Sequence, residues 1–143
     1  TGYYIAEQYA EAGYRGHFDI DMIASNSKHI YVDESNTRNT GGTDIYKLVY
    51  DLYGEDFFSD VYVINRNNYK FNNQETVSFR KIIDTLKPIL YDKKKKEGLI
   101  LSSSASLQSN QLLYTVLGKN KKRAYELQGN FYELLKPFGQ PKF

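Results

Sequence analysis

The sequence contains no cysteine, and only three of its 143 residues are proline. The absence of cysteine excludes disulfide bonds, thiolate metal sites and cysteine nucleophiles, and it fits a reducing compartment. No apolar run approaches the roughly 20 residues that a membrane-spanning helix needs, and no secretory signal pattern is recognisable. We therefore expect a cytoplasmic protein with no membrane partner.

A strong charge of one sign is also missing. Nineteen Lys and Arg residues stand against seventeen Asp and Glu residues, so the net charge is +2. This excess is small for a dedicated nucleic-acid-binding protein, and we expect no nucleic-acid partner. The length, the 41% hydrophobic content and the 25% charged content are typical of one globular domain with a single core. Because Thr1 opens a segment with a helical pattern, we expect a fragment of a longer protein.

Periodicity predicts four helices separated by short strands. The first helix is predicted to end near residue 12, and the second to run from an N-cap at Thr43 to just before Gly54. The third is predicted to end before Pro88 and the fourth at Pro137. The strands are predicted at 16–24, 29–37, 61–64, 98–102 and 112–117, with a loop over the asparagine-rich residues 65–73. This order lacks the strict alternation of a doubly wound sheet. It favours an α+β fold in which an antiparallel sheet with a β-hairpin packs against helices.

The segments 16–24 and 29–37 alternate polar and apolar residues, which predicts that they pair as a β-hairpin around the polar turn 25–28. In the second segment the alternation puts Ile30 and Val32 in phase with the polar residues that follow them. If the turn is centred between Asn26 and Ser27, the expected facing pairs are Asp19 with Glu34 and Asp21 with Val32.

Four polar side chains are predicted to share one face of this hairpin and to converge there: Asp19, Asp21, Glu34 and Asn36. Carboxylates packed together repel one another unless a cation neutralises them. Oxygen ligands suit Mg²⁺, which retains water and takes phosphate oxygens from a substrate. Arg38 follows directly and could hold a phosphoryl group or a carboxylate. On geometry alone, a hydrophilic hairpin with its acidic residues facing solvent is equally compatible with this pattern.

Residues 11–43 resemble the C-terminal catalytic part of the ATP-grasp superfamily. The shared pattern is an Asp on one strand, here Asp21, followed across a short hairpin by Glu-x-Asn-x-Arg, which residues 34–38 match. The Arg-Asn-Thr-Gly-Gly-Thr sequence at 38–43 is most similar to peptide ligases related to the pheganomycin ligase. Residues 1–143 would then be the C-terminal part of an ATP-grasp domain.

This resemblance implies an ATP-dependent carboxylate-amine ligase that uses ATP and Mg²⁺. A carboxylate substrate is activated as an acyl phosphate, and an amine attacks it to give an amide or peptide bond. The implied metal ligands are Asp21, Glu34 and Asn36, the implied catalytic residues are Glu34 and Arg38, and the implied nucleotide contacts are Asn36, Arg38, Gly41 and Gly42. The lysines that hold the nucleotide in this superfamily have no match here, so the remaining lobes of a longer chain would supply them.

The alternative interpretation is a non-catalytic α+β protein-interaction domain, in which the acidic hairpin is only a surface. The histidines and the lysine run could also carry chemistry, but we expect ordinary structural roles for them. His17 and His29 are too few for a histidine metal site, and we expect them to be exposed or hydrogen-bonded. The lysine run 93–96 is flanked by Asp92 and Glu97 and is typical of a solvated loop.

Overall fold

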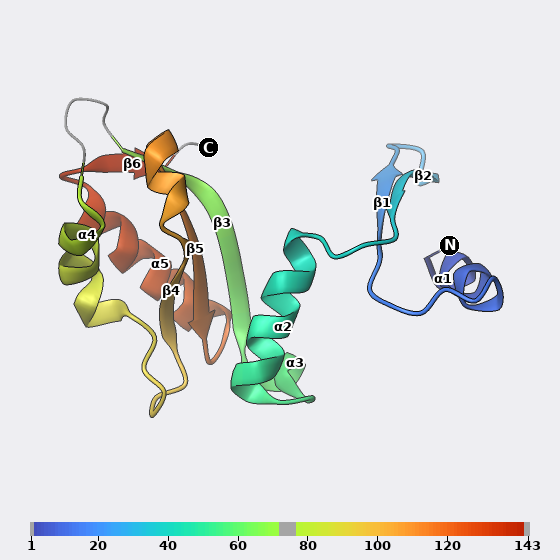
Figure 1. Ribbon diagram of the computed structural model, residues 1–143, viewed down its shortest axis with the longest axis horizontal. Helices are drawn as coiled ribbons and strands as arrows, with labels where there is room; N and C mark the ends of the chain where they lie inside the picture. The colour runs from blue at the N-terminus through green and yellow to red at the C-terminus, as the bar shows by residue number, and fades with distance from the viewer. Residues whose placement is uncertain (1, 72–76, 142–143) are drawn as a thin grey trace. The chain divides into compact units, whose positions relative to one another are not determined.

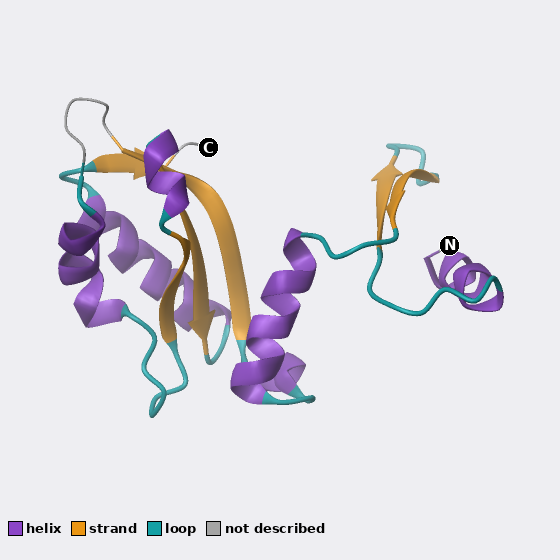
Figure 2. Cartoon of the chain, viewed as in Figure 1, coloured by secondary structure: helices purple, strands orange, loops and turns teal. Residues whose placement is uncertain are grey.

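Helices and antiparallel strands together form this chain, which confirms the predicted α+β class (Figure 2). The computed structural model describes residues 2–71 and 77–141. The chain divides into two units, Thr1–Asp51 and Leu52–Phe143, and Figure 1 labels their elements. Within the described residues, no helix has the length and apolar character required to cross a membrane.

The N-terminal unit contains α1 (Gly2–Glu11), β1 (Asp19–Ala24), β2 (Ile30–Asn36) and most of α2 (Gly41–Tyr53). Helix α1 ends where predicted, and Gly13 follows it with a φ of 88°, a conformation that glycine adopts without strain. Strands β1 and β2 form a two-stranded antiparallel sheet. The hairpin predicted from the alternating pattern is therefore confirmed.

Few side chains in this unit are buried. Among residues 2–51, only Thr43 and Val49 are buried, and both belong to α2. Helix α1 is held to the hairpin by polar and aromatic contacts instead. The Tyr9 hydroxyl donates a hydrogen bond to Ser35 Oγ over 2.6 Å, and the Tyr9 ring meets the Phe18 ring edge-on at 5.3 Å.

The start of α2 differs from the prediction. Thr43 was expected to be the N-cap, but the helix already begins at Gly41, and Thr43 lies in its first turn. The Thr43 hydroxyl oxygen accepts a hydrogen bond from the backbone N–H of Thr40 over 3.1 Å. A side chain that reaches back in this way satisfies a donor in front of the helix, as in a capping box. Gly41 and Gly42 therefore belong to the helix rather than to the preceding loop.

The C-terminal unit is built on a four-stranded antiparallel sheet in the order β4-β5-β3-β6. Its strands are β3 (Tyr62–Phe71), β4 (Gly98–Ser103), β5 (Gln111–Gly118) and β6 (Gly139–Pro141). Its helices are α3 (Phe57–Asp60), α4 (Phe79–Leu86), α5 (Lys121–Leu135) and the short 3-10 helices η1 (Lys87–Ile89) and η2 (Ala105–Ser109). The ends of α4 and α5 agree with the predicted stops at Pro88 and Pro137.

The core of this unit lies between the sheet and helices α4 and α5. Alternate residues of β5 supply Leu112, Tyr114 and Val116, all completely buried. Helix α5 contributes the apolar stripe that its sequence predicts, including Leu127 and Phe131. The Tyr114 and Phe131 rings lie 4.2 Å apart at their centroids, so they join the sheet directly to α5.

Strand β3 corrects the predicted loop at 65–73. Residues 65–71 continue the strand, and residues 72 and 73 lie outside the described part of the chain. Tyr69 is fully buried, and its hydroxyl donates to the carbonyl oxygen of Leu135 over 2.5 Å. Burial of Tyr69 and Phe71 against neighbouring elements therefore outweighs the turn preference of asparagine. The short elements α3 and β6 were not predicted at all.

Candidate functional site

The hairpin turn is one residue longer than predicted, because a turn centred between positions 26 and 27 would contain only the four residues 25–28. Ala24 pairs with Ile30, which leaves the five residues 25–29 in the turn. The backbone N–H of Ser25 donates to the carbonyl of His29 over 2.9 Å, and Lys28 takes up a left-handed conformation with a φ of 64°. This extra residue shifts the register of the strands by one.

A β-bulge in β2 shifts the register by one more residue. Met22 pairs with Val32 and Asp21 pairs with Glu34, so Asp33 has no partner on β1. Beyond the bulge Asp19 pairs with Asn36. The predicted pairs, Asp19 with Glu34 and Asp21 with Val32, are therefore wrong.

The two shifts together preserve the face on which the polar residues lie. A slip of one residue moves a side chain to the opposite face of a strand, whereas a slip of two residues restores it. Because paired residues point to the same side, the acidic face of the hairpin carries Asp19, Asp21, Glu34 and Asn36.

The bulge also places Ile30 and Val32 of β2 on the face opposite the acidic residues. The sequence pattern put Ile30 and Val32 in phase with Glu34, but the pairing of Val32 with Met22 turns them to the other side. Met22, Ile30 and Val32 remain 42%, 56% and 45% exposed there. The hairpin thus has an acidic face, which also carries the exposed pair Ile23 and Tyr31, and a partly exposed apolar face.

Arg38 lies beside the acidic face and contacts one of its members. Its Nη2 donates a hydrogen bond to Asn36 Oδ1 over 2.9 Å, and its Nη1 contacts the carbonyl oxygen of Asn39 at 3.4 Å. Arg38 and Glu34 are exposed, whereas Asn36 is half-buried. The guanidinium group is therefore next to a predicted metal ligand and open to solvent.

Oxygen donors on the acidic face fit Mg²⁺ by their chemistry. The predicted set of Asp21, Glu34 and Asn36 contains two carboxylates and an amide, and Mg²⁺ is commonly held by one or two carboxylates together with water and substrate phosphates. Asp19 Oδ1 adds a carboxylate oxygen that is buried without a hydrogen-bond partner in the described structure. Burial of such an oxygen is costly unless a cation or a donor approaches it.

The expected convergence of three carboxylates is not found. Within residues 2–71 and 77–141, no group of three or more His, Cys, Asp or Glu side chains is gathered closely enough to hold a metal ion. Asp19, Asp21 and Glu34 share a face but do not form such a group. A cation on this face would therefore depend on the Asn36 amide and on oxygens from a substrate.

Gly41 and Gly42 follow the acidic face in sequence and are both exposed. Their backbone N–H groups belong to the first turn of α2, where such groups have no intrahelical acceptor.

The two histidines are exposed or hydrogen-bonded, as expected. His29 Nδ1 lies 3.0 Å from Ser27 Oγ, and the His17 ring packs near the Tyr46 ring at 5.6 Å.

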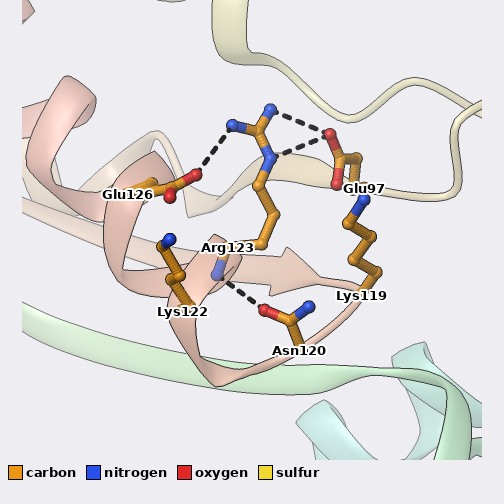
Figure 3. A pocket seen from close by; sticks show the side chains of 6 residues that line it. All are labelled: Glu97, Lys119, Asn120, Lys122, Arg123 and Glu126. Carbon is orange, nitrogen blue, oxygen red and sulfur yellow. Dashed lines mark hydrogen bonds and ion pairs between the residues drawn. The ribbon is translucent and has the colours of Figure 1, made fainter.

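A second candidate site lies in the C-terminal unit and was not predicted. A surface pocket of about 490 Å³ is lined by Glu97, Lys119, Asn120, Lys122, Arg123 and Glu126 (Figure 3). Arg123 lies between the two carboxylates, with Nε and Nη2 at 3.1 and 2.9 Å from Glu97 Oε1 and Nη1 at 3.3 Å from Glu126 Oε2. The hydrogen bonds that Arg123 donates to Glu97 raise the pKa of Arg123 above its ordinary value.

The sequence offered little signal for this pocket. Glu97 and Arg123 are 26 residues apart, and only the pairing of β4 with β5 brings them together. The Asn120 side chain does have a local signature, because its Oδ1 caps α5 by accepting from the Arg123 N–H over 2.9 Å.

No protein-family model matches this chain, and a search of curated proteins gave no significant match.

Proposed function

We propose that this chain is the C-terminal catalytic part of an ATP-grasp carboxylate-amine ligase that forms an amide or peptide bond. The observation that carries the proposal is the pairing of Asp21 with Glu34 on a hairpin face that also bears Asn36, with Arg38 hydrogen-bonded to that asparagine. The resemblance of residues 34–38 to the ATP-grasp pattern, and of residues 38–43 to the peptide ligases, supports the same function.

In this proposal Asp21, Glu34 and Asn36 hold Mg²⁺ through side-chain oxygens. When bound, Mg²⁺ neutralises the phosphates of ATP and helps to orient the γ-phosphoryl group. Arg38 supplies a planar guanidinium group that can donate two hydrogen bonds to a phosphoryl group or to an acyl phosphate. Its bond to Asn36 Oδ1 places that group directly beside the proposed ligands.

The first turn of α2 would bind the substrate. Gly41 and Gly42 carry no side chain that could block the approach of a substrate to their backbone N–H groups. The positive end of the helix dipole favours a negatively charged group at this position. The carboxylate substrate, or the phosphate that it receives, has the charge that this turn would attract.

A non-catalytic interaction domain is the second candidate. The apolar face of the hairpin supports it, because Met22, Ile30 and Val32 are exposed side by side. Exposed apolar groups of this kind are typical of surfaces that bind another protein segment. In this case the acidic residues on the opposite face would only make that face hydrophilic.

ATP turnover by the full-length protein distinguishes the two candidates. Release of ADP would be followed with mixed amino acids and peptides as acceptors, with and without EDTA. The ligase proposal expects turnover that requires Mg²⁺ and is lost in Glu34→Gln but kept in Glu7→Gln, which makes the same change on the exposed side of α1. Equal turnover in the two variants would exclude the hairpin as the site.

A further inference from the structure

The small net charge of the chain hides two units of opposite charge. Residues 1–51 contain four Lys and Arg against eight Asp and Glu, so this unit has a net charge of −4. Residues 52–143 contain fifteen Lys and Arg against nine Asp and Glu, which gives +6. The expectation of no nucleic-acid partner depended on the average of these two values. The C-terminal unit has to be considered by itself.

Sheet topology brings two basic segments together in this unit. Gly98 at the start of β4 pairs with Leu117 near the end of β5, so the residues before β4 and those after β5 leave the sheet at the same end. The ion pair of Glu97 with Arg123 joins the two segments directly (Figure 3). We call the following seven exposed lysines the basic end: Lys93, Lys94, Lys95, Lys96, Lys119, Lys121 and Lys122.

The acidic residues of these segments are already engaged. Asp92 Oδ1 accepts backbone hydrogen bonds from Lys94 and Lys95 over 2.7 and 3.3 Å. Glu97 and Glu126 both bind Arg123, and the Glu97 side chain is only 15% exposed. In the described part of the chain, no lysine of the basic end forms an ion pair. The Lys96 ammonium group lies over the Tyr53 ring, 5.9 Å from its centre, and the other six ammonium groups present their charge to solvent.

The basic end has the chemistry of a surface for phosphates. Lysine is a hydrated point charge that suits phosphate oxygens, and it is depleted from protein–protein interfaces, whose centres are apolar. Among the described residues of this unit, the exposed large apolar side chains are Phe58, Phe79 and Tyr125, and none lies in segments 92–97 or 119–123. An apolar anchor for a protein partner or for a lipid bilayer is therefore missing from these segments.

We propose that the basic end binds the phosphate backbone of double-stranded nucleic acid without reading its sequence. Arg123, the residue type that would read guanine, is already occupied by two carboxylates. The pocket between Lys119 and Lys122 gives the surface a hollow in which a backbone phosphate can sit. This activity is independent of the proposed ligase, because it requires only residues of the C-terminal unit.

Fluorescence anisotropy with a labelled 20-base-pair duplex tests the proposal on the 143-residue chain. The expected dissociation constant lies between about 10⁻⁴ and 10⁻⁶ M near physiological salt. The variants are K94Q/K95Q and K119Q/K122Q, one for each segment, and the matched control is K28Q/K47Q in the N-terminal unit. Each lysine that contacts a phosphate should reduce the slope of log affinity against log salt by about 0.9.

Both basic-end variants should therefore weaken binding and flatten this slope, whereas the control should do neither. Thermal melts of all variants show whether the fold is kept, which is expected because the substituted side chains are exposed. No duplex binding at 50 mM salt would overturn the proposal, as would equal losses in the control. Tighter binding of polyglutamate or of phosphatidylserine vesicles than of the duplex would assign the surface to an acidic protein or to a membrane, and would also overturn it.

Discussion

Asp21 lies directly opposite Glu34, and it does so because Asp33 is left out of the strand pairing. If β2 continued regularly beyond Val32, Asp33 would face Asp21, and Glu34 would turn to the apolar side. The bulge therefore decides which acidic residue joins the acidic face.

Replacement of Glu34 by Gln should abolish most of the ligase activity of the full-length protein. The change removes a charge that would neutralise Mg²⁺ while preserving size, so we expect turnover to fall by about 100-fold or more. Thermal stability should hold or rise, because Glu34 is exposed opposite another carboxylate. Coupled ADP release and a thermal melt measure both effects, and near-normal turnover would contradict the assignment.

Replacement of Arg38 by Lys should also reduce turnover strongly. A lysine keeps the charge but cannot form the planar fork that contacts a phosphoryl group, and it loses the bond to Asn36 Oδ1. The matched control is Arg80→Lys, which makes the same change in an exposed pair with Asp84. Similar kcat values for the two variants would show that a positive charge alone is sufficient at position 38.

The isolated 143 residues should bind MgATP weakly. The acidic face offers two carboxylates and an amide, which leave Mg²⁺ largely hydrated, and the nucleotide lysines are expected on other lobes. Calorimetric titration should therefore give no saturable binding below about 10 μM, or roughly −7 kcal/mol. Tight binding would place the whole nucleotide site within this chain.

Replacement of Gly98 by Ala should destabilise the C-terminal unit. Gly98 has a φ of 135°, and an added Cβ would lie 2.6 Å from the carbonyl oxygen of Leu90. We expect a loss of about 3 kcal/mol or more. Gly129→Ala is the control, because α5 leaves open space there, and it should stabilise by about 0.5–1 kcal/mol. Chemical denaturation compares them, and equal midpoints would contradict the close approach.

Alkaline pH should weaken the fold through buried tyrosines. Burial raises the pKa of Tyr69 and Tyr114 well above the ordinary 10.0. The unfolded chain releases these protons near pH 10 while the folded chain keeps them. Their contribution is therefore complete below pH 10, and the free energy of unfolding falls above it by up to about 1.4 kcal/mol per pH unit and tyrosine.

Denaturation at pH 9, 10 and 11 measures this effect. Tyr69→Phe removes one titrating group and should reduce the fall between pH 10 and 11. Tyr3→Phe is the control, because Tyr3 is 91% exposed. The same fall in both variants would mean that other groups cause the loss.

Local patterns predicted the helices well, because their signals lie within one or two turns. The apolar spacing of α4 and α5 and the prolines behind them located both helices. The polar face of the hairpin was also predicted, although its pairs were wrong. Errors of one residue in the turn and one at the bulge added to two, which keeps Asp19 and Asp21 on the face of Glu34 and Asn36. Ile30 and Val32, in contrast, lie on the opposite face from the one predicted.

Long-range partners were beyond the reach of the sequence. Asparagines 65, 67 and 68 favour a turn locally, but Tyr69 is drawn into a core that includes residues more than 40 positions away, such as Leu112 and Phe131. The pair of Glu97 and Arg123 likewise exists only because β4 lies beside β5. Register and burial are properties of the assembled sheet, so a short stretch of sequence does not determine them.

The uneven distribution of buried side chains has a consequence for how this sequence can vary. In the C-terminal unit most apolar positions are fixed by packing, so related sequences can change there only by compatible repacking. Residues 2–40 include no buried side chain, so interior packing exerts little selection on them. An invariant residue on β1 or β2 that makes no contact with α1, unlike Ser35, would therefore owe its invariance to what the hairpin binds, and its drift would show that the binding had been lost.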